Sequence, residues 1–321
     1  MEAHVRGRTV VLTATLAAIV ATNFARAQSP GGRRDVQQGI AEVNGTKLYY
    51  EIAGAGAPVA LIHGNFGDRR HWDAQFETFA RTFRVMRYDV RGFGKSAVPV
   101  EGQRYAHHED LAALMRHLGF ENAHIVGLSM GSYIATDFVL THPEMSRSLV
   151  AIAPWVSGYQ SSSDEVKAMF AAFSAVGKAF AGGNPEAAIN AWSNSPYWRK
   201  TTPDTAVRAR VRAIGRDHRF WEFVHEDPAV PVQPRTVTQV SRIAVPTLIL
   251  TAEHDASREV ADFLERSIPN ARKVVMQGAG HFMQMDRPAE FNRIVTAFLR
   301  EVDAARPNRE RSNHTTDDHG R

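Results

Sequence analysis

The stretch HIVGLSMGSYIA, residues His124–Ala135, decides how this chain should fold. An apolar run leads into Gly127, Ser129 stands between that glycine and Gly131, and a helical pattern follows without a break. A strand that turns into a helix through G-x-S-x-G is typical of a nucleophile elbow, whose strained turn exposes the serine hydroxyl at the carboxyl edge of a sheet. Both glycines should be required, because a Cβ at either position would crowd the turn. The pattern predicts a nucleophilic serine, provided that the rest of the chain supplies such a sheet.

The rest of the chain shows the alternation that this sheet requires. Short runs rich in Val, Ile, Leu and Met alternate with longer helical patterns, and continuous apolar runs are typical of strands buried on both faces of a parallel sheet. The alternation predicts a doubly wound α/β fold. Strands are expected at 48–52, 59–62, 85–88, 124–126, 149–151, 247–250 and 273–276, and helices at 110–118, 133–140, 258–267 and 289–299.

The alternation stops between about residues 155 and 241, where helical patterns at 163–180, 186–192 and 204–214 carry many aromatic residues. We interpret this stretch as a helical cap over a binding site, although most of its rings should pack the cap on itself. The candidates for substrate contact are one residue outside the cap and three within it, namely Phe66, Trp192, Trp198 and Trp221.

A serine hydroxyl needs a base beside it, and the base needs a group that orients it. His281 lies in the Gly-rich loop 278–282, which follows a predicted strand and would let the imidazole reach across the sheet edge. The expected orienting carboxylate is Asp255, just past another predicted strand, with Glu253 as the alternative. The chain order of Ser, then Asp, then His is the order that this kind of elbow uses.

The negative charge that develops on the substrate oxygen needs backbone N–H donors. One donor is expected from Met130, which follows the nucleophile, and the other from Asn65, or alternatively Phe66, in the loop after an early strand. His63, in the same loop, should brace the loop by hydrogen bonds rather than take part in the chemistry.

Two further patterns predict no site. The run GFGKS at 92–96 resembles the end of a phosphate loop, but that loop needs a glycine at position 89, where the chain has Asp89. The run His107-His108-Glu109-Asp110 lacks the H-E-x-x-H spacing of a zinc site and should begin a helix. We therefore expect no metal site.

The composition is that of a globular protein, with 321 residues, 44% of them hydrophobic and 22% charged. The net charge is only +4 and no run of Lys and Arg predicts a nucleic-acid groove, so nucleic acid is not an expected partner. The chain has no cysteine, so the fold has no disulfide. The polar segment 303–321 should be a disordered tail.

The N-terminus predicts a secretory signal peptide at 1–27. Two arginines, Arg6 and Arg8, precede an apolar stretch at 10–21 and the cleavage signal Ala25-Arg26-Ala27. The apolar stretch is too short to span a bilayer, so no stable membrane insertion is expected after cleavage behind Ala27. The expected location is periplasmic or secreted, and an uncleaved anchor or a misassigned start is the alternative.

Together these motifs make the chain resemble the α/β-hydrolase superfamily over about residues 40–302. The residues that carry the resemblance are His63-Gly64, Asp89–Ser96, Gly127–Gly131, Asp255 and Gly280-His281. The resemblance implies a mostly parallel eight-stranded sheet flanked by helices, a helical cap inserted after the sixth strand, and catalysis without a cofactor. The expected divisions are a core of residues 28–154 and 242–302 and a cap of residues 155–241. The chain most resembles small esterases, enol-lactonases and cofactor-free perhydrolases of the haloperoxidase type.

The predicted function is hydrolysis of a small carboxylic ester or lactone through an acyl-enzyme intermediate. Ser129 would be the nucleophile, His281 the base and Asp255 the group that orients it. Epoxide hydrolases and haloalkane dehalogenases carry Asp at the nucleophile position, and serine C–C bond hydrolases usually carry Trp where this chain has Phe282. Three alternatives stay open: C–C bond hydrolysis, peroxyacid formation, and ligand binding without turnover. The sequence does not identify the substrate.

Overall fold

The computed structural model describes residues 35–223, 225 and 228–314, with residues 307–314 described by their backbone alone. The predicted signal peptide at 1–27 lies outside the described residues. No helix within these ranges is long and apolar enough to cross a membrane.

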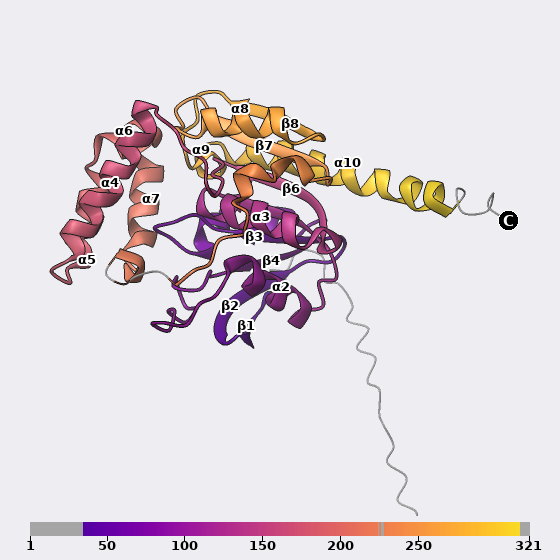
Figure 1. Ribbon diagram of the computed structural model, residues 1–321, viewed down its shortest axis with the longest axis horizontal. Coiled ribbons are helices and arrows are strands. Elements are labelled where there is room, and N and C mark those ends of the chain that lie inside the picture. The colour runs from indigo at the N-terminus through magenta and orange to yellow at the C-terminus, as the bar shows by residue number, and fades with distance from the viewer. Residues whose placement is uncertain (1–34, 224, 226–227, 315–321) are drawn as a thin grey trace, which may run out of the picture. The chain divides into compact units, whose positions relative to one another are not determined.

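One eight-stranded sheet organises the fold, as predicted (Figure 1). Its strands lie in the order β1-β2-β4-β3-β5-β6-β7-β8. The strand β2 pairs antiparallel with both neighbours, and all the other pairings are parallel. The strands are β1 (Gln37–Val43), β2 (Thr46–Ala53), β3 (Pro58–Ile62), β4 (Arg84–Tyr88), β5 (Ala123–Leu128), β6 (Ser146–Ile152), β7 (Thr247–Ala252) and β8 (Ala271–Met276).

The apolar pattern of the sequence misses β1, because β1 is an edge strand and most of it faces solvent. Ile40, at its centre, is 58% exposed. A different signal marks this strand, namely the pair Asn44-Gly45 between β1 and β2. Both residues have positive φ, 47° and 68°, which is the conformation of a two-residue hairpin turn that Asn-Gly favours. The turn sets Val43 opposite Thr46.

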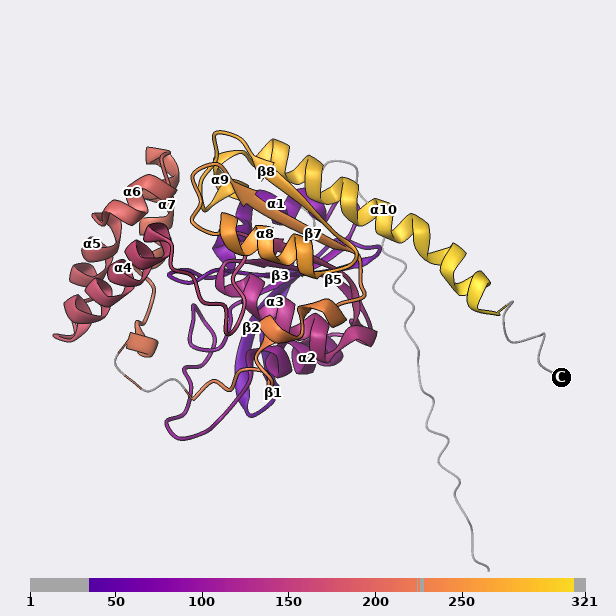
Figure 2. The ribbon, with the colours of Figure 1, turned by 45° about the horizontal axis from the view of Figure 1, so that its top comes forward.

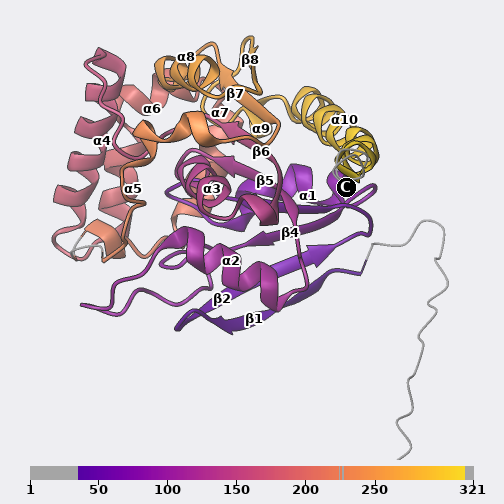
Figure 3. The same cartoon turned by 45° about the vertical axis from the view of Figure 1, so that its right-hand side comes forward.

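Helices cover both faces of the sheet, so the central strands are buried on both sides. The helices α1 (Asp73–Phe79) and α10 (Pro288–His314) contact each other and pack on one face (Figure 3). The other face carries α2 (His107–His117), α3 (Met130–Thr141) and α8 (Arg258–Ser267).

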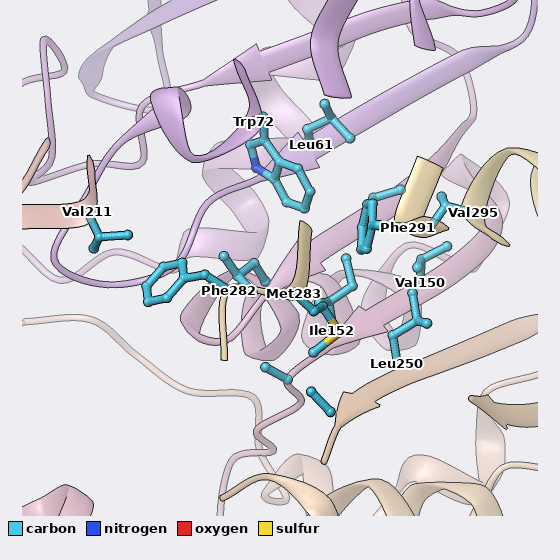
Figure 4. Packing of buried hydrophobic residues seen from close by; sticks show 14 of the residues in the cluster. Leu61, Trp72, Val150, Ile152, Val211, Leu250, Phe282, Met283, Phe291 and Val295 are labelled. Atoms are coloured by element: carbon cyan, nitrogen blue, oxygen red, sulfur yellow. The ribbon is translucent and has the colours of Figure 1, made fainter. Parts of the chain in front are cut away.

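The side chains of β3 point alternately into the apolar layers on the two faces of the sheet. Leu61 belongs to the same apolar cluster as Trp72 and Phe291 (Figure 4), whereas its neighbour Ile62 belongs to the cluster under α2 and α3. Successive strand residues point to opposite faces, and this is why a buried parallel strand reads as an unbroken apolar run.

We call residues 164–223, between β6 and β7, the cap, in which the short 3-10 helix η3 (Trp221–Phe223) follows four α-helices (Figures 1 and 2). The four α-helices are α4 (Asp164–Phe180), α5 (Pro185–Ser193), α6 (Pro196–Thr201) and α7 (Thr205–Gly215). Each begins after a residue whose side chain accepts a hydrogen bond from an N–H of the first turn, namely Ser163, Asn184, Ser195 and Asp204. Such caps satisfy donors that have no partner within the helix. The sequence pattern misses α6 because it is so short.

The predicted tail begins too early, because α10 continues to His314 and residues 303–314 are therefore helical. Val302 is only 6% exposed, and the Oδ1 atom of Asp303 lies 2.9 Å from a guanidinium nitrogen of Arg147 and 3.1 Å from Nε2 of His124. These contacts hold the helix beyond its predicted end. Residues 315–321 lie outside the described residues.

A buried carboxylate joins α3 to the segment that follows the cap. Asp137 is 2% exposed and accepts a hydrogen bond from the hydroxyl of Thr236, in the short 3-10 helix η4 (Thr236–Thr238). Burial raises the pKa of Asp137 from its ordinary 3.8 to about 6, although the hydrogen bonds from Thr236 and Tyr133 oppose the shift. The folded protein therefore holds a proton at Asp137 more tightly than the unfolded chain does.

This difference makes the free energy of unfolding depend on pH. Because the pKa is higher in the folded state, the contribution of Asp137 to stability decreases as the pH rises from about 4 to about 6. Asp137→Asn should remove this dependence. We expect the stability of the wild type relative to Asp137→Asn to fall by about 1 to 1.5 kcal/mol between about pH 5 and pH 8, measured by urea denaturation. The exposed Glu121→Gln is the control, and parallel pH curves for the wild type and Asp137→Asn would contradict the assignment.

Candidate active site

The predicted nucleophile lies on a strained turn between β5 and α3. Ser129 has φ 55° and ψ −113°, a backbone conformation that side-chain-bearing residues rarely adopt. The turn is held from both sides, because the N–H of Ser129 donates to the carbonyl of Ile152 at 2.8 Å and its own carbonyl accepts from Ser132 and Tyr133. The predicted elbow is confirmed.

The two glycines of the elbow are required by space. A Cβ on Gly127 would lie 2.1 Å from the carbonyl oxygen of Gly131, and a Cβ on Gly131 would lie 2.2 Å from that of Ile62. Both neighbours are backbone atoms, which cannot rotate away as a side chain does. The first turn of α3 therefore packs on β3 more closely than any other residue type would allow.

The predicted base and its carboxylate are in direct contact. Nδ1 of His281, after β8, lies 2.9 Å from Oδ1 of Asp255, after β7. The other oxygen, Oδ2, accepts a hydrogen bond from the hydroxyl of Ser257 at 2.6 Å. The alternative carboxylate, Glu253, is exposed and instead accepts the N–H of Gly278 at 2.8 Å.

The contacts of Asp255 keep it ionised. The residue is only 5% exposed, and burial alone would raise its pKa. The opposing effects of the His281 charge and of hydrogen bonds from His281 and Ser257 are larger, so the pKa of Asp255 is lowered overall. An ionised Asp255 can hold Nδ1–H of His281 in place, and this leaves Nε2 as the nitrogen that can accept a proton.

The sheet places the three residues at one edge, because Ser129, Asp255 and His281 each follow the carboxyl end of a strand in the parallel run from β5 to β8. In the described part of the chain, Asp255 hydrogen-bonds His281, whereas the Ser129 hydroxyl makes no hydrogen bond to His281. Hydrogen bonds between a catalytic base and its nucleophile often tighten only when substrate is bound. Proton transfer between Ser129 and His281 stays a prediction.

The two expected oxyanion donors come together at one cavity, which both Asn65 and Met130 line. The alternative donor, Phe66, is already in use, because its N–H donates to the side-chain oxygen of Asn65 at 2.7 Å. Among the described residues, the N–H groups of Asn65 and Met130 donate to no other group. The geometry therefore favours Asn65 over Phe66.

His63 braces the loop that carries Asn65, as predicted. Its Nδ1 lies 2.8 Å from the carbonyl oxygen of Gly64, and its Nε2 accepts the N–H of Val90 at 3.0 Å. These contacts assign the proton to Nδ1, and burial lowers the pKa of His63, so the ring stays neutral. The loop after β4 is fixed in turn by Asp89, whose carboxylate accepts the N–H groups of Arg69 at 3.0 Å and Lys95 at 2.8 Å.

The cavity beside the oxyanion donors has a volume of about 440 Å³. Of the four residues predicted to contact substrate, Trp221 lines this cavity. Phe66 stacks on Trp192 with ring centroids 4.3 Å apart, and Trp198 is 1% exposed beside Phe282. The part of these residues in substrate binding stays a prediction.

Sequence reasoning missed several residues that line this cavity, chiefly Arg91, Tyr105, Tyr133 and Arg235. Arg91 and Tyr133 lie inside motifs that were recognised for another reason, and Arg235 lies in a segment with no motif at all. No local sequence signal marks any of them as a cavity residue. Within the described residues, no group of three or more His, Asp or Glu side chains is placed to hold a metal ion.

Comparison with known proteins gives relatives that are named for several different activities. A protein of Azorhizobium caulinodans named "Putative carbamate hydrolase RutD" is 27% identical over 276 residues, which cover 80% of this chain and 96% of that protein. The structure of the enol-lactonase from Burkholderia xenovorans LB400 matches with a TM-score of 0.66 at 24% identity, over 81% of this chain and 99% of that one. The structure of Est816, described as an N-acyl homoserine lactone degrading enzyme, matches with a TM-score of 0.63 at 26% identity, over 81% and 100%.

The first of these relatives is named as a carbamate hydrolase and Est816 is described as a lactone-degrading enzyme, and both support hydrolase activity for this chain. The enol-lactonase structure shows the same fold. The family model described as the alpha/beta hydrolase fold matches residues 57–288, which is well over half of the sequence. The match includes the elbow, the oxyanion loop, the carboxylate and the histidine. The chain belongs to the α/β-hydrolase fold family.

Proposed function

We propose that this protein is a serine hydrolase that cleaves a small carboxylic ester or lactone through an acyl-enzyme intermediate. The observation that carries the proposal is the strained turn at Ser129, at the same sheet edge as the hydrogen-bonded pair of His281 and Asp255. A serine on an ordinary turn needs neither a positive φ nor an oriented imidazole nearby. The combination is what nucleophilic catalysis by a hydroxyl requires.

The proposed reaction has two halves. Nε2 of His281 takes the hydroxyl proton as Oγ of Ser129 attacks the carbonyl carbon, and the N–H groups of Asn65 and Met130 bind the oxyanion of the tetrahedral intermediate. The intermediate then releases the alcohol, which receives the proton from His281 and leaves the acyl group on Ser129. A water molecule, deprotonated by His281, attacks this ester in the second half, and His281 returns the proton to Oγ of Ser129 as the acid leaves.

The relatives support acyl transfer but leave the substrate open. One is named for carbamates and another for N-acyl homoserine lactones, and both names describe acyl groups bonded to a heteroatom. An activity screen should therefore compare short esters and lactones with vinylogous diketones, which test C–C cleavage, and with peroxide plus acetate, which tests peroxyacid formation. Turnover confined to the diketones or to peroxide plus acetate would overturn the proposal in favour of that reaction.

We expect a fluorophosphonate to label Ser129 selectively. An unactivated serine reacts poorly with such reagents at neutral pH, because it lacks an adjacent base. Ser132 is the internal control, since it lies in the first turn of the same helix with a buried hydroxyl. The label should disappear in Ser129→Ala, be strongly reduced in His281→Ala, and persist in the presence of a chelator. Mass spectrometry that placed the adduct on another residue, or found none on folded protein, would favour a binding protein without turnover.

Replacing the orienting carboxylate tests the second half of the triad. Asp255→Asn should lower kcat by about 10⁴-fold, the loss seen in the serine-protease template when the histidine is no longer held in the productive tautomer. Glu253→Gln is the matched control, since Glu253 follows the same strand but contacts Gly278 instead of His281. Steady-state kinetics on the best ester should show near-normal turnover for this control. Near-normal turnover in Asp255→Asn together with a large loss of turnover in Glu253→Gln would assign the orienting role to Glu253 instead.

A further inference from the structure

The cavity beside Asn65 and Met130 has the size of a small-molecule site, and its lining includes two positive side chains and one negative side chain. Its volume of about 440 Å³ lies within the range usual for ligand pockets. Besides Asn65 and Met130, its lining includes the two guanidinium groups of Arg91 and Arg235 and the carboxylate of Glu222. Which of these charges is free to bind a ligand depends on the partners that each already has.

Arg91 is already paired. Its Nε and Nη2 atoms donate to the two carboxylate oxygens of Asp110 at 2.8 and 2.7 Å, and Nη2 also donates to the carbonyl of Asn44 at 2.9 Å. The side chain is 2% exposed, and its guanidinium lies 4.2 Å from the ring centroid of Tyr105. The charge of Asp110 balances that of Arg91, so Arg91 contributes to the cavity lining without a charge that is free to bind a ligand.

Arg235 is not paired in this way. It is exposed, and its Nη1 donates one long hydrogen bond, 3.3 Å, to the hydroxyl of Ser157. Among the described residues, no carboxylate lies within ion-pair distance of it. The charge of Arg235 does act on Asp137, where it lowers the pKa, but Asp137 is hydrogen-bonded to Thr236 and makes no ion pair with Arg235.

Within the described part of the chain the Arg235 guanidinium uses one of its five donors, so it presents a planar fork that matches a carboxylate. Glu222, the acidic residue among the described lining residues, lies 3.2 Å from Nε2 of His218. Its negative charge would repel an anion that entered the cavity. The cavity therefore favours a ligand whose negative end lies at Arg235 and away from Glu222.

We infer that the cavity binds the carboxylate of an anionic substrate at Arg235, so that the ester or lactone cleaved by this protein also carries an acid group. This inference rests on the proposed function, since it assigns the cavity beside Asn65 and Met130 to that substrate. It makes Arg235 a residue that determines specificity through charge, with no part in the proton transfers.

Two matched substrate pairs test the inference. The first pair is 4-nitrophenyl butyrate and mono-4-nitrophenyl glutarate, which places the carboxylate in the acyl part. The second is phenyl butyrate and 3-carboxyphenyl butyrate, which places it in the alcohol part. In the wild type, the ratio of kcat/KM for the anionic ester to that for the neutral ester should be high for at least one pair. Arg235→Gln should lower that ratio by about 10- to 100-fold, the range expected for loss of a charge-assisted hydrogen bond.

Three further variants sharpen the result. Arg235→Lys should restore part of the ratio, because it keeps the charge but loses the planar fork. Glu222→Gln should raise the ratio, since it removes the repelling charge. Arg242→Gln, an exposed residue outside the cavity lining, should leave the ratio unchanged. A ratio in Arg235→Gln equal to that of the wild type for both pairs would overturn the inference and leave the proposed hydrolase function intact.

A binding measurement separates the two proposals. Glutarate should bind to Ser129→Ala, which cannot turn over substrate, and calorimetry should show at least a tenfold weaker affinity in Ser129→Ala/Arg235→Gln. If the wild type hydrolyses no ester but glutarate binds in this Arg235-dependent way, the hydrolase proposal fails and the anion site stands. If glutarate does not bind, or binds equally to both variants, the anion site fails.

Discussion

The close approach of the first turn of α3 to β3 is the constraint on which the geometry of the candidate active site depends. At Gly131 the helix backbone lies so near the carbonyl of Ile62 that no side chain fits between them. A Cβ on Gly64, in the loop after β3, would lie 3.3 Å from the Cβ of Ser129. This packing fixes the distance between the elbow and the oxyanion loop. The N–H groups of Met130 and Asn65, although far apart in the sequence, therefore meet at one cavity before any substrate arrives.

The conformational strain at Ser129 is sustained by this packing. A positive φ at a residue with a side chain is costly, of the order of 1 to 3 kcal/mol, and persists only where the surroundings determine it. Here the hydrogen bond from Ser129 to Ile152 and the contact of α3 with β3 hold the strained backbone of Ser129 in this conformation. His63 ties the loop after β3 to the loop after β4, because its Nε2 accepts a hydrogen bond from the N–H of Val90. The loops that carry the proposed oxyanion donors are thus held in place by hydrogen bonds and packing that need no substrate.

The parts of the fold and site that could be predicted are those encoded locally. Ser129, Asp255 and His281 each follow a strand that an apolar run marks in the sequence, so their place at the sheet edge follows from strand periodicity and chain order. The strand β1 was missed because its sequence, QQGIAEV, contains no continuous apolar run, and only the turn at Asn44-Gly45 marks it. The sequence pattern also missed the extension of α10 beyond residue 302, because this extension depends on contacts of its side chains with residues far away in the sequence.

The role that we propose for Arg235 could not be predicted from the sequence, because it rests on the absence of a carboxylate partner for Arg235 among the described residues. Whether an arginine is paired depends on the positions of carboxylates elsewhere in the chain, as the contrast between Arg91 and Arg235 shows. No periodicity or motif encodes that difference. The same is true of the cap aromatics, whose composition predicts a cap but does not distinguish a ring that lines a cavity, such as Trp221, from one that is packed away, such as Trp198.

The cap also contacts the loops that carry the proposed catalytic residues, and these contacts limit how it can move. The N–H of His281 donates to the carbonyl of Thr201, at the end of α6, at 2.6 Å, and Phe66 in the oxyanion loop stacks on Trp192 of α5. The exposed ion pairs between cap and core, such as Arg70 with Asp217, contribute little, because exposed pairs are screened by solvent. A cap that swung away would therefore release the histidine loop and the oxyanion loop together. We expect a small substrate to enter through the mouth of the cavity, with the cap in place.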